Sequence, residues 1–192
     1  MAASYDDNAN DLSNSQASPT PFSLTLGANS IIGSVGGANI QGSNQDWIAI
    51  TVPAGMQMTS YVNAAYSGAD AQGFTGFQFG SPFVGLPGTA GPYAGYAHFG
   101  TGAQNPTVPT STVGVDLLPL MANPSVAAGA SGFTPPLGPG TYAFLIQQTN
   151  SNAVIAYEFD INTVPEPGTL CLLGLGGLGL LAPTISRIRR KL

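Results

Sequence analysis

Short runs in which apolar and polar residues alternate make up most of the chain ahead of residue 164. In the clearest run, residues 153–161, the large apolar positions are Ile155, Tyr157, Phe159 and Ile161. Two acids, Glu158 and Asp160, lie between them. Because the side chains of a β-strand alternate between its two faces, this spacing predicts a half-buried strand.

Two further runs predict strands in different surroundings. Residues 46–52 carry isoleucine and valine on one face, whereas residues 141–148 are apolar on both faces for most of their length. A strand that is apolar on both faces is typical of the centre of a sheet. The turn-forming sequences Pro-Ala-Gly at 53–55 and Gly-Pro-Gly at 138–140 adjoin these strands.

The remaining candidate strands are short and are separated by Gly, Pro, Asn and Ser. They lie at 22–26, 30–35, 57–67, 74–80 and 95–99. No stretch of this region has sustained helical periodicity. We therefore expect an all-β fold, an antiparallel β-sandwich of the jelly-roll kind over residues 21–163, after a flexible polar N-terminus at residues 1–20.

Charged residues are few and unevenly distributed. They make up 7% of the chain, and all of the bases lie at its C-terminal end, at Arg187, Arg189, Arg190 and Lys191. An acidic domain without bases repels a phosphate backbone, so we expect no nucleic-acid partner. The single cysteine, Cys171, can form neither an intramolecular disulfide nor a cysteine metal site.

An uncharged apolar segment comes before the four bases. Residues 168–186 include seven leucines and no charge. As a helix this segment would span roughly 28 Å, about the thickness of the hydrocarbon core of a bilayer. We therefore expect a single transmembrane helix at residues 169–186. Basic residues beside a membrane span are retained on the cytoplasmic side. The tail at residues 187–192 should therefore lie in the cytoplasm and the domain outside it.

The segment between the domain and the predicted span contains two prolines, in the order Val164, Pro165, Glu166 and Pro167. Proline fixes φ and excludes a regular helix, so residues 164–168 are predicted to form an extended, accessible stalk. The order of a Pro-Glu-Pro motif, an apolar span and an Arg-rich end resembles the PEP-CTERM sorting signal of Gram-negative bacteria. This resemblance covers residues 164–192.

The resemblance implies that the protein is exported and recognised by exosortase, a membrane protease-transpeptidase. It also implies a connection with exopolysaccharide or biofilm production. The domain resembles the β-sandwich ectodomains that accompany this signal and, more loosely, pre-peptidase C-terminal domains. The shared features are an Asp-aromatic strand that ends in Pro-Ala-Gly, at residues 46–55, and a later strand that begins Gly-Thr-Tyr, at residues 140–142. Such domains are accessory modules, so the resemblance implies no catalytic residues.

The first residues, MAASYDDNANDLSNSQ, contain neither the basic nor the apolar region of an export signal. Two interpretations stay open. Either the natural start lies upstream, or the protein is tail-anchored with its domain in the cytoplasm. The basic tail favours the first, in which the domain is held outside the bacterial membrane and then reaches the cell surface or the extracellular matrix.

Candidate catalytic residues are sparse. His98 is the single histidine, and the chain has no Gly-x-Ser-x-Gly sequence, so a nucleophilic triad is not expected. A small two-carboxylate hydrolase remains an alternative. Its candidate acids are Asp46, Asp70, Asp116, Glu158 and Asp160. We expect a non-enzymatic protein without a cofactor.

No metal site is assigned from the sequence, although an acidic domain without bases could bind calcium through loop oxygens elsewhere. Asp6, Asn8 and Asn10 have the spacing of the first ligands of a calcium loop. However, Asp11 and Ala17 stand where that loop has its glycine and its bidentate glutamate. A flexible polar segment explains these residues more simply.

Aromatic residues make carbohydrate binding a second hypothesis. A ring with one open face can stack on a sugar, while Asn and Gln side chains supply hydrogen bonds. Trp47 is the first candidate, because it lies on the strand face opposite Ile48 and Ile50. The further candidates are Tyr61, Tyr66, Tyr93 and Tyr96. The predicted ectodomain thus has a structural role, or binds a polysaccharide or another surface protein.

Overall fold

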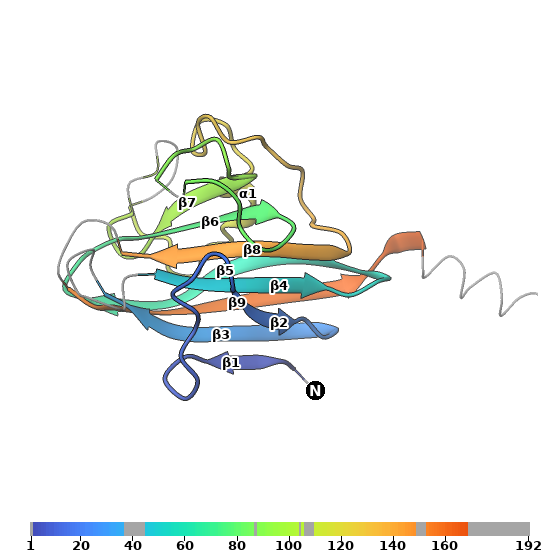
Figure 1. Ribbon diagram of the computed structural model, residues 1–192, viewed down its shortest axis with the longest axis horizontal. Helices are drawn as coiled ribbons and strands as arrows, with labels where there is room; N and C mark the ends of the chain where they lie inside the picture. Colours follow the sequence, from blue (N-terminus) through green and yellow to red (C-terminus); the bar gives the residue numbers. More distant parts are fainter. Residues whose placement is uncertain are drawn as a thin grey trace, which may run out of the picture.

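The computed structural model describes residues 2–36, 45–86, 88–103, 105, 110–148 and 153–168. The chain forms two β-sheets whose inner faces share one hydrophobic core (Figure 1). The predicted all-β fold is confirmed for this part of the chain. No helix among these residues is long and apolar enough to cross a membrane. The span predicted at 169–186 and the basic tail lie outside the described residues.

The first sheet has four strands in the order β1-β3-β9-β5. Their bounds are Ser4–Asp6 for β1, Gly27–Val35 for β3, Ile155–Pro165 for β9 and Met56–Gly68 for β5. The long strand β9 lies between β3 and β5 and is antiparallel to both. It includes the most regular alternation in the sequence, and it continues beyond the predicted end of the domain.

The second sheet has five strands in the order β2-β4-β8-β6-β7. Their bounds are Thr20–Ser23 for β2, Gln45–Val52 for β4, Gly140–Gln147 for β8, Gly73–Phe79 for β6 and Gly95–Phe99 for β7. The central position predicted for the strand near residues 141–148 is confirmed, since β8 lies between β4 and β6. One short helix, α1, covers Leu118–Met121 in the described chain.

The sheets are mixed, whereas the sequence predicted an antiparallel sandwich. Strand β1 runs parallel to β3, and β2 runs parallel to β4. The reason is the path of the chain, which crosses from one sheet to the other between β1, β2, β3 and β4. Two successive reversals through the opposite sheet bring the chain back in its original direction, so these edge pairs are parallel.

Aromatic side chains from both sheets form the centre of the core. Tyr61 of β5 stacks on Phe159 of β9, with ring centroids 4.4 Å apart, and lies 5.2 Å from Phe144 of β8. The four apolar residues predicted for one face of β9 are all buried, which confirms that strand. Burial of these rings supplies a large part of the hydrophobic stabilisation that a domain of this size needs.

The outer face of the second sheet carries a smaller apolar cluster. Trp47 of β4 and Leu145 of β8 belong to it, and Phe83 and Tyr93, from the segment between β6 and β7, cover them. Alternate residues of β8 point either into the main core or into this cluster. This second cover explains why β8 is apolar on both faces.

The N-terminal segment is part of the sandwich. Strand β1 pairs with β3, and Leu12 is fully buried in the main core. The backbone N–H of Leu12 donates a 2.6 Å hydrogen bond to the buried carboxylate of Asp7. A flexible N-terminus was predicted at residues 1–20. In the structure, the part of this segment that is described, from residue 2 onward, packs against the sandwich through β1 and Leu12.

Candidate functional site

The sorting motif begins inside the last strand of the sandwich. Val164 and Pro165 are the final residues of β9, and they lie opposite Gln57 and Met56 of β5. The extended conformation predicted for residues 164–168 holds for Val164 and Pro165, whereas Pro167 and Gly168 are helical, so the free stalk is shorter than predicted. Half of the Val-Pro-Glu-Pro motif is part of the folded sheet.

A turn holds the third residue of the motif. The backbone N–H of Glu166 donates a 2.8 Å hydrogen bond to the carbonyl oxygen of Gly55. Gly55 has φ of 78°, in the left-handed region that glycine adopts without strain, and belongs to the Pro-Ala-Gly turn between β4 and β5. Beyond this contact, Pro167 and Gly168 are exposed.

The residue just before the motif is firmly anchored. Thr163 is 2% exposed, and its hydroxyl donates a 2.6 Å hydrogen bond to the carbonyl oxygen of Thr25. The same hydroxyl accepts a 3.1 Å hydrogen bond from the backbone N–H of Gly27. Because β3 begins at Gly27, opposite Thr163, the pairing with β3 ends where the motif begins. The motif itself is paired with β5 alone.

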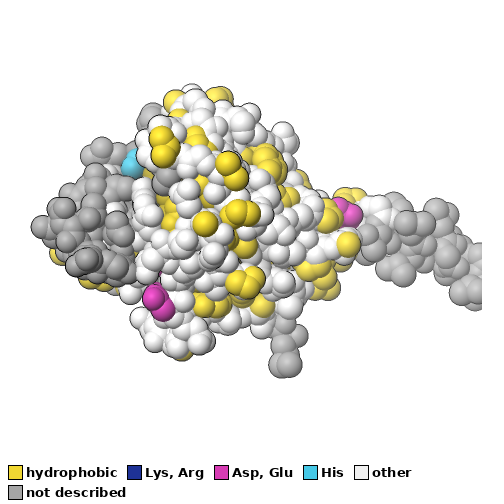
Figure 2. Space-filling view, in the orientation of Figure 1, with side chains coloured by type: hydrophobic (Ala, Val, Ile, Leu, Met, Phe, Trp, Pro, Cys, Tyr) yellow, Lys and Arg dark blue, Asp and Glu magenta, His cyan; other side chains and the backbone are white. Residues whose placement is uncertain are grey.

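The end of the sandwich that carries the motif is poor in charge. Leu26 and Phe79 expose about half of their surface there, at 56% and 54%, and Val164 exposes 37%. Strand register places all three at this end, where β9 and β6 finish and β3 starts. Figure 2 shows hydrophobic side chains around the point where the described chain ends, with an acidic group beside them.

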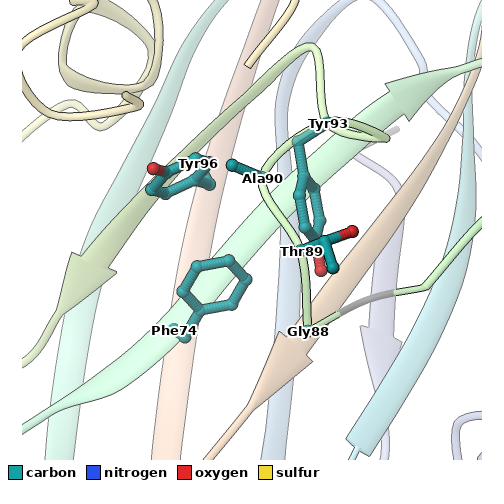
Figure 3. Close-up of a pocket in the computed structure, with 6 residues that line it drawn as sticks. All are labelled: Phe74, Gly88, Thr89, Ala90, Tyr93 and Tyr96. Carbon is teal, nitrogen blue, oxygen red and sulfur yellow. The ribbon is translucent and has the colours of Figure 1, made fainter. Parts of the chain in front are cut away.

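An aromatic hollow lies on the outer face of the second sheet, apart from the motif. Its volume is about 170 Å³, and Phe74 of β6, Tyr96 of β7 and Tyr93 line it together with residues 88–90 (Figure 3). The ring centroids of Phe74 and Tyr96 lie 5.6 Å apart, with 32° between their planes. The Tyr96 hydroxyl donates a 2.7 Å hydrogen bond to the carbonyl oxygen of Ala128, which fixes that ring.

Trp47, the first candidate for stacking on a sugar, lies beneath the cover of the second sheet. The side chain is 1% exposed, and its ring centroid is 5.0 Å from that of Phe83. The indole N–H donates a 3.2 Å hydrogen bond to the Gln45 side chain. A ligand would reach this ring only if Phe83 moved aside. The other candidates differ in position: Tyr61 is in the main core, and the partly buried Tyr66 packs against that core. Tyr93 and Tyr96 border the hollow.

Among the candidate acids, Asp46 has the most unusual surroundings. It is 3% exposed and accepts a 2.6 Å hydrogen bond from the Tyr157 hydroxyl. Burial raises the pKa of Asp46 to about 8, and the nearby charges of Asp7 and Asp11 add to this increase. The hydrogen bond from Tyr157 acts in the opposite direction. The group links the two sheets and lies beneath the protein surface.

Two other acids stabilise loops. A carboxylate oxygen of Asp116 accepts hydrogen bonds from the backbone N–H groups of Tyr61 and Leu118, at 2.9 and 3.1 Å. Asp70 accepts a 2.7 Å hydrogen bond from the side chain of Gln148. Both acids thus have hydrogen-bond partners within the fold. Glu158 and Asp160 are partly exposed on β9.

The N-terminal Asp-Asn run forms a turn that satisfies its own polar groups. One carboxylate oxygen of Asp6 accepts hydrogen bonds from the backbone N–H and the side-chain amide of Asn8, both at 3.0 Å. No group of three or more His, Cys, Asp and Glu residues suited to a metal occurs within the described ranges. His98 packs edge-on against Phe74, and burial lowers its pKa.

Sequence reasoning did not identify the residues that hold the motif. The carbonyl oxygen of Gly55 contacts Glu166, and the Thr163 hydroxyl anchors the strand just before the motif to Thr25. Such backbone and hydroxyl contacts leave little trace in composition. One signal was present: the alternation of β9 continues past Ile161 through the buried Thr163. A strand pattern that continues to the motif indicates that the motif adjoins a folded edge.

Comparison with protein families gives a match in the tail. A model of the PEP-CTERM protein-sorting motif matches residues 163–190. The comparisons with curated proteins and with solved structures give no match. The resemblance of the domain to pre-peptidase C-terminal domains therefore stays a prediction. In the tail, the resemblance is confirmed: residues 163–190 of this chain carry a PEP-CTERM protein-sorting motif.

Proposed function

We propose that the protein is an exported β-sandwich that an exosortase-like membrane enzyme processes at its C-terminal signal. After processing, the sandwich has a non-enzymatic structural or binding role at the cell surface or in an extracellular matrix, in association with exopolysaccharide or biofilm. One observation carries this proposal: the match to the sorting motif at 163–190 begins within the last strand of a folded all-β domain.

The charge distribution supports the proposed topology. Every base of the chain lies after the predicted span, at residues 187–191, while all nine acids lie before it. Basic residues beside a span are retained in the cytoplasm, so the sandwich is placed on the outer side. A domain whose surface is mostly uncharged and polar, with a few acids and no bases, suits a hydrated polysaccharide matrix, where it would not depend on ion pairs.

The test is the mass of the mature protein. The chain is expressed in a bacterium that contains a matching sorting enzyme, with and without replacement of Pro165, Glu166 and Pro167 by alanine. Pro124→Ala, in an exposed loop, serves as the control. We expect loss of residues after the motif in the natural chain and in the control, and an intact tail in the triple variant. An intact tail in all three chains would contradict the proposal.

The aromatic hollow favours a second candidate function, the binding of a sugar chain. Phe74 and Tyr96, which are partly exposed and come from two neighbouring strands, present ring surface to one hollow, with the buried Tyr93 beside them (Figure 3). Its volume, about 170 Å³, is below the roughly 300–1,000 Å³ of pockets that enclose a drug-sized ligand. It therefore fits one ring of a polysaccharide rather than a whole small molecule.

Retention on an insoluble polysaccharide tests this second function. We expect Tyr96→Ala and Phe74→Ala to reduce retention, because both remove surface on which a sugar ring could stack. Phe79→Ala is the matched control, since that ring is exposed at the other end of β6. Equal retention of all four proteins would exclude the hollow as the binding site. Trp47→Ala is a poorer test, because it removes a core side chain.

A further inference from the structure

We propose that the sandwich controls access to its own sorting motif. In this view the pairing of β9 with β5 covers the start of the motif, and the processing enzyme binds the motif only after the end of β9 has separated from β5. The inference rests on the proposed function, because it concerns how the same motif is used. It assigns a regulatory role to the turn between β4 and β5, which lies outside the motif.

No flexible linker separates the core of the sandwich from the motif. Thr163, buried and hydrogen-bonded to Thr25, is the residue immediately before Val164. Val164 and Pro165 continue the ladder with β5, and Glu166 is bonded to the adjacent turn. Only Pro167 and Gly168 separate this last contact from the predicted span. Two residues reach at most about 7 Å when extended.

A membrane enzyme would therefore meet the motif in contact with a folded domain. Enzymes and binding domains that take extended peptides commonly form main-chain hydrogen bonds with them and hold alternate side chains in pockets. On the side that faces β5, Val164 and Pro165 of the motif are already paired with Gln57 and Met56. An enzyme that surrounds its substrate needs this side to be free.

The structure also makes release feasible. Beyond Thr163 the strand has a neighbour on one side only, because β3 starts at Gly27. Proline has no N–H, so Pro165 and Pro167 donate no hydrogen bond to the ladder. The end of β9 is thus held by few contacts, while Thr163 fixes the strand just before them. Such a segment can open locally without unfolding of the core.

The main test separates the motif from β5 while its sequence is kept. A flexible six-residue Gly-Ser insertion between Thr163 and Val164 is compared with the same insertion between Gly168 and Thr169. The first frees the motif from the strand pair, whereas the second lengthens the chain and leaves the motif paired. The rate of tail removal is followed by pulse-chase in a host with the sorting enzyme. Thermal unfolding confirms that each sandwich is intact.

We expect the insertion before Val164 to accelerate processing several-fold, and the insertion after Gly168 to give no acceleration. Equal acceleration by both would show that distance from the membrane limits the reaction, and would overturn the inference. No acceleration by the first would do the same, because it would mean that the enzyme accepts the docked strand. The alanine triple variant, combined with the first insertion, must stay unprocessed. If it is processed, the proposed function itself fails.

Discussion

The hydroxyl of Tyr157 on β9 donates a 2.6 Å hydrogen bond to a carboxylate oxygen of Asp46 on β4. This buried contact joins the two sheets, which otherwise meet mainly through apolar side chains. An acid in this position has consequences for the pH dependence of folding. A buried carboxyl favours its neutral form, since burial penalises the charge.

Stability should decrease as the pH rises from about 4 to about 8 because of Asp46. Its pKa is about 8 in the folded protein against an ordinary value of 3.8, so between these values the folded state binds more protons than the unfolded state. The contribution is fully present below about 3.8 and is lost as the pH rises through 8. One unit of pKa difference corresponds to about 1.4 kcal/mol, so the free energy of unfolding of the natural protein should fall by roughly 5 kcal/mol from pH 4 to pH 8 relative to that of Asp46→Asn, as measured by urea unfolding.

Asparagine can still accept the hydrogen bond from Tyr157, but it cannot titrate. The control is therefore isosteric, and the comparison removes the effects of other acids. If both proteins show the same slope of stability between pH 5 and 8, Asp46 has an ordinary pKa, and its burial does not govern the pH response.

Replacement of Tyr157 by phenylalanine should destabilise the fold by about 1 to 3 kcal/mol, because the buried Asp46 would lose its hydrogen-bond donor. Gly33→Ala should have a related effect. A Cβ at residue 33 would meet the Tyr157 hydroxyl and would force the ring away from Asp46. Chemical denaturation measures both changes. If Tyr157→Phe unfolds at the same denaturant concentration as the natural protein, the contact does not contribute to stability.

Thr163→Val should loosen the anchor before the motif. The hydroxyl that reaches the Thr25 carbonyl oxygen would be lost, at a cost of about 1 kcal/mol. Thr163→Ser keeps the hydroxyl and should retain more of the stability. Amide hydrogen exchange of the Val164 to Glu166 segment is the measurement. We expect faster exchange in the valine variant, and unchanged exchange would show that β5 alone holds the segment.

Phe83→Ala should expose the single tryptophan. Phe83 covers Trp47 at 5.0 Å between ring centroids, so its removal would open the outer cluster to water. We expect a red shift of the tryptophan emission, stronger quenching by acrylamide and a loss of about 3 to 5 kcal/mol. Phe79→Ala, which removes an exposed ring, should change neither fluorescence property. A blue-shifted, unquenched Trp47 in Phe83→Ala would show that other groups cover it.

The strand pattern and the tail were readable from the sequence because both are local. Alternation with a period of two identified β9, and the order of motif, apolar segment and basic end identified the sorting signal. Neither conclusion required knowledge of which segments meet in space. The short strand β1 was missed because three residues carry too little alternation to stand out.

Tertiary structure alone decided which face of each strand is covered and by what. Trp47 lies on the face that its neighbours predicted to be outward, but Phe83, far along the chain, covers that face. The same applies to the motif: Val164 and Pro165 look like a linker in sequence, and they become strand because β5 offers a partner there. Alternation defines two faces and two edges, whereas long-range pairing determines what each of them contacts.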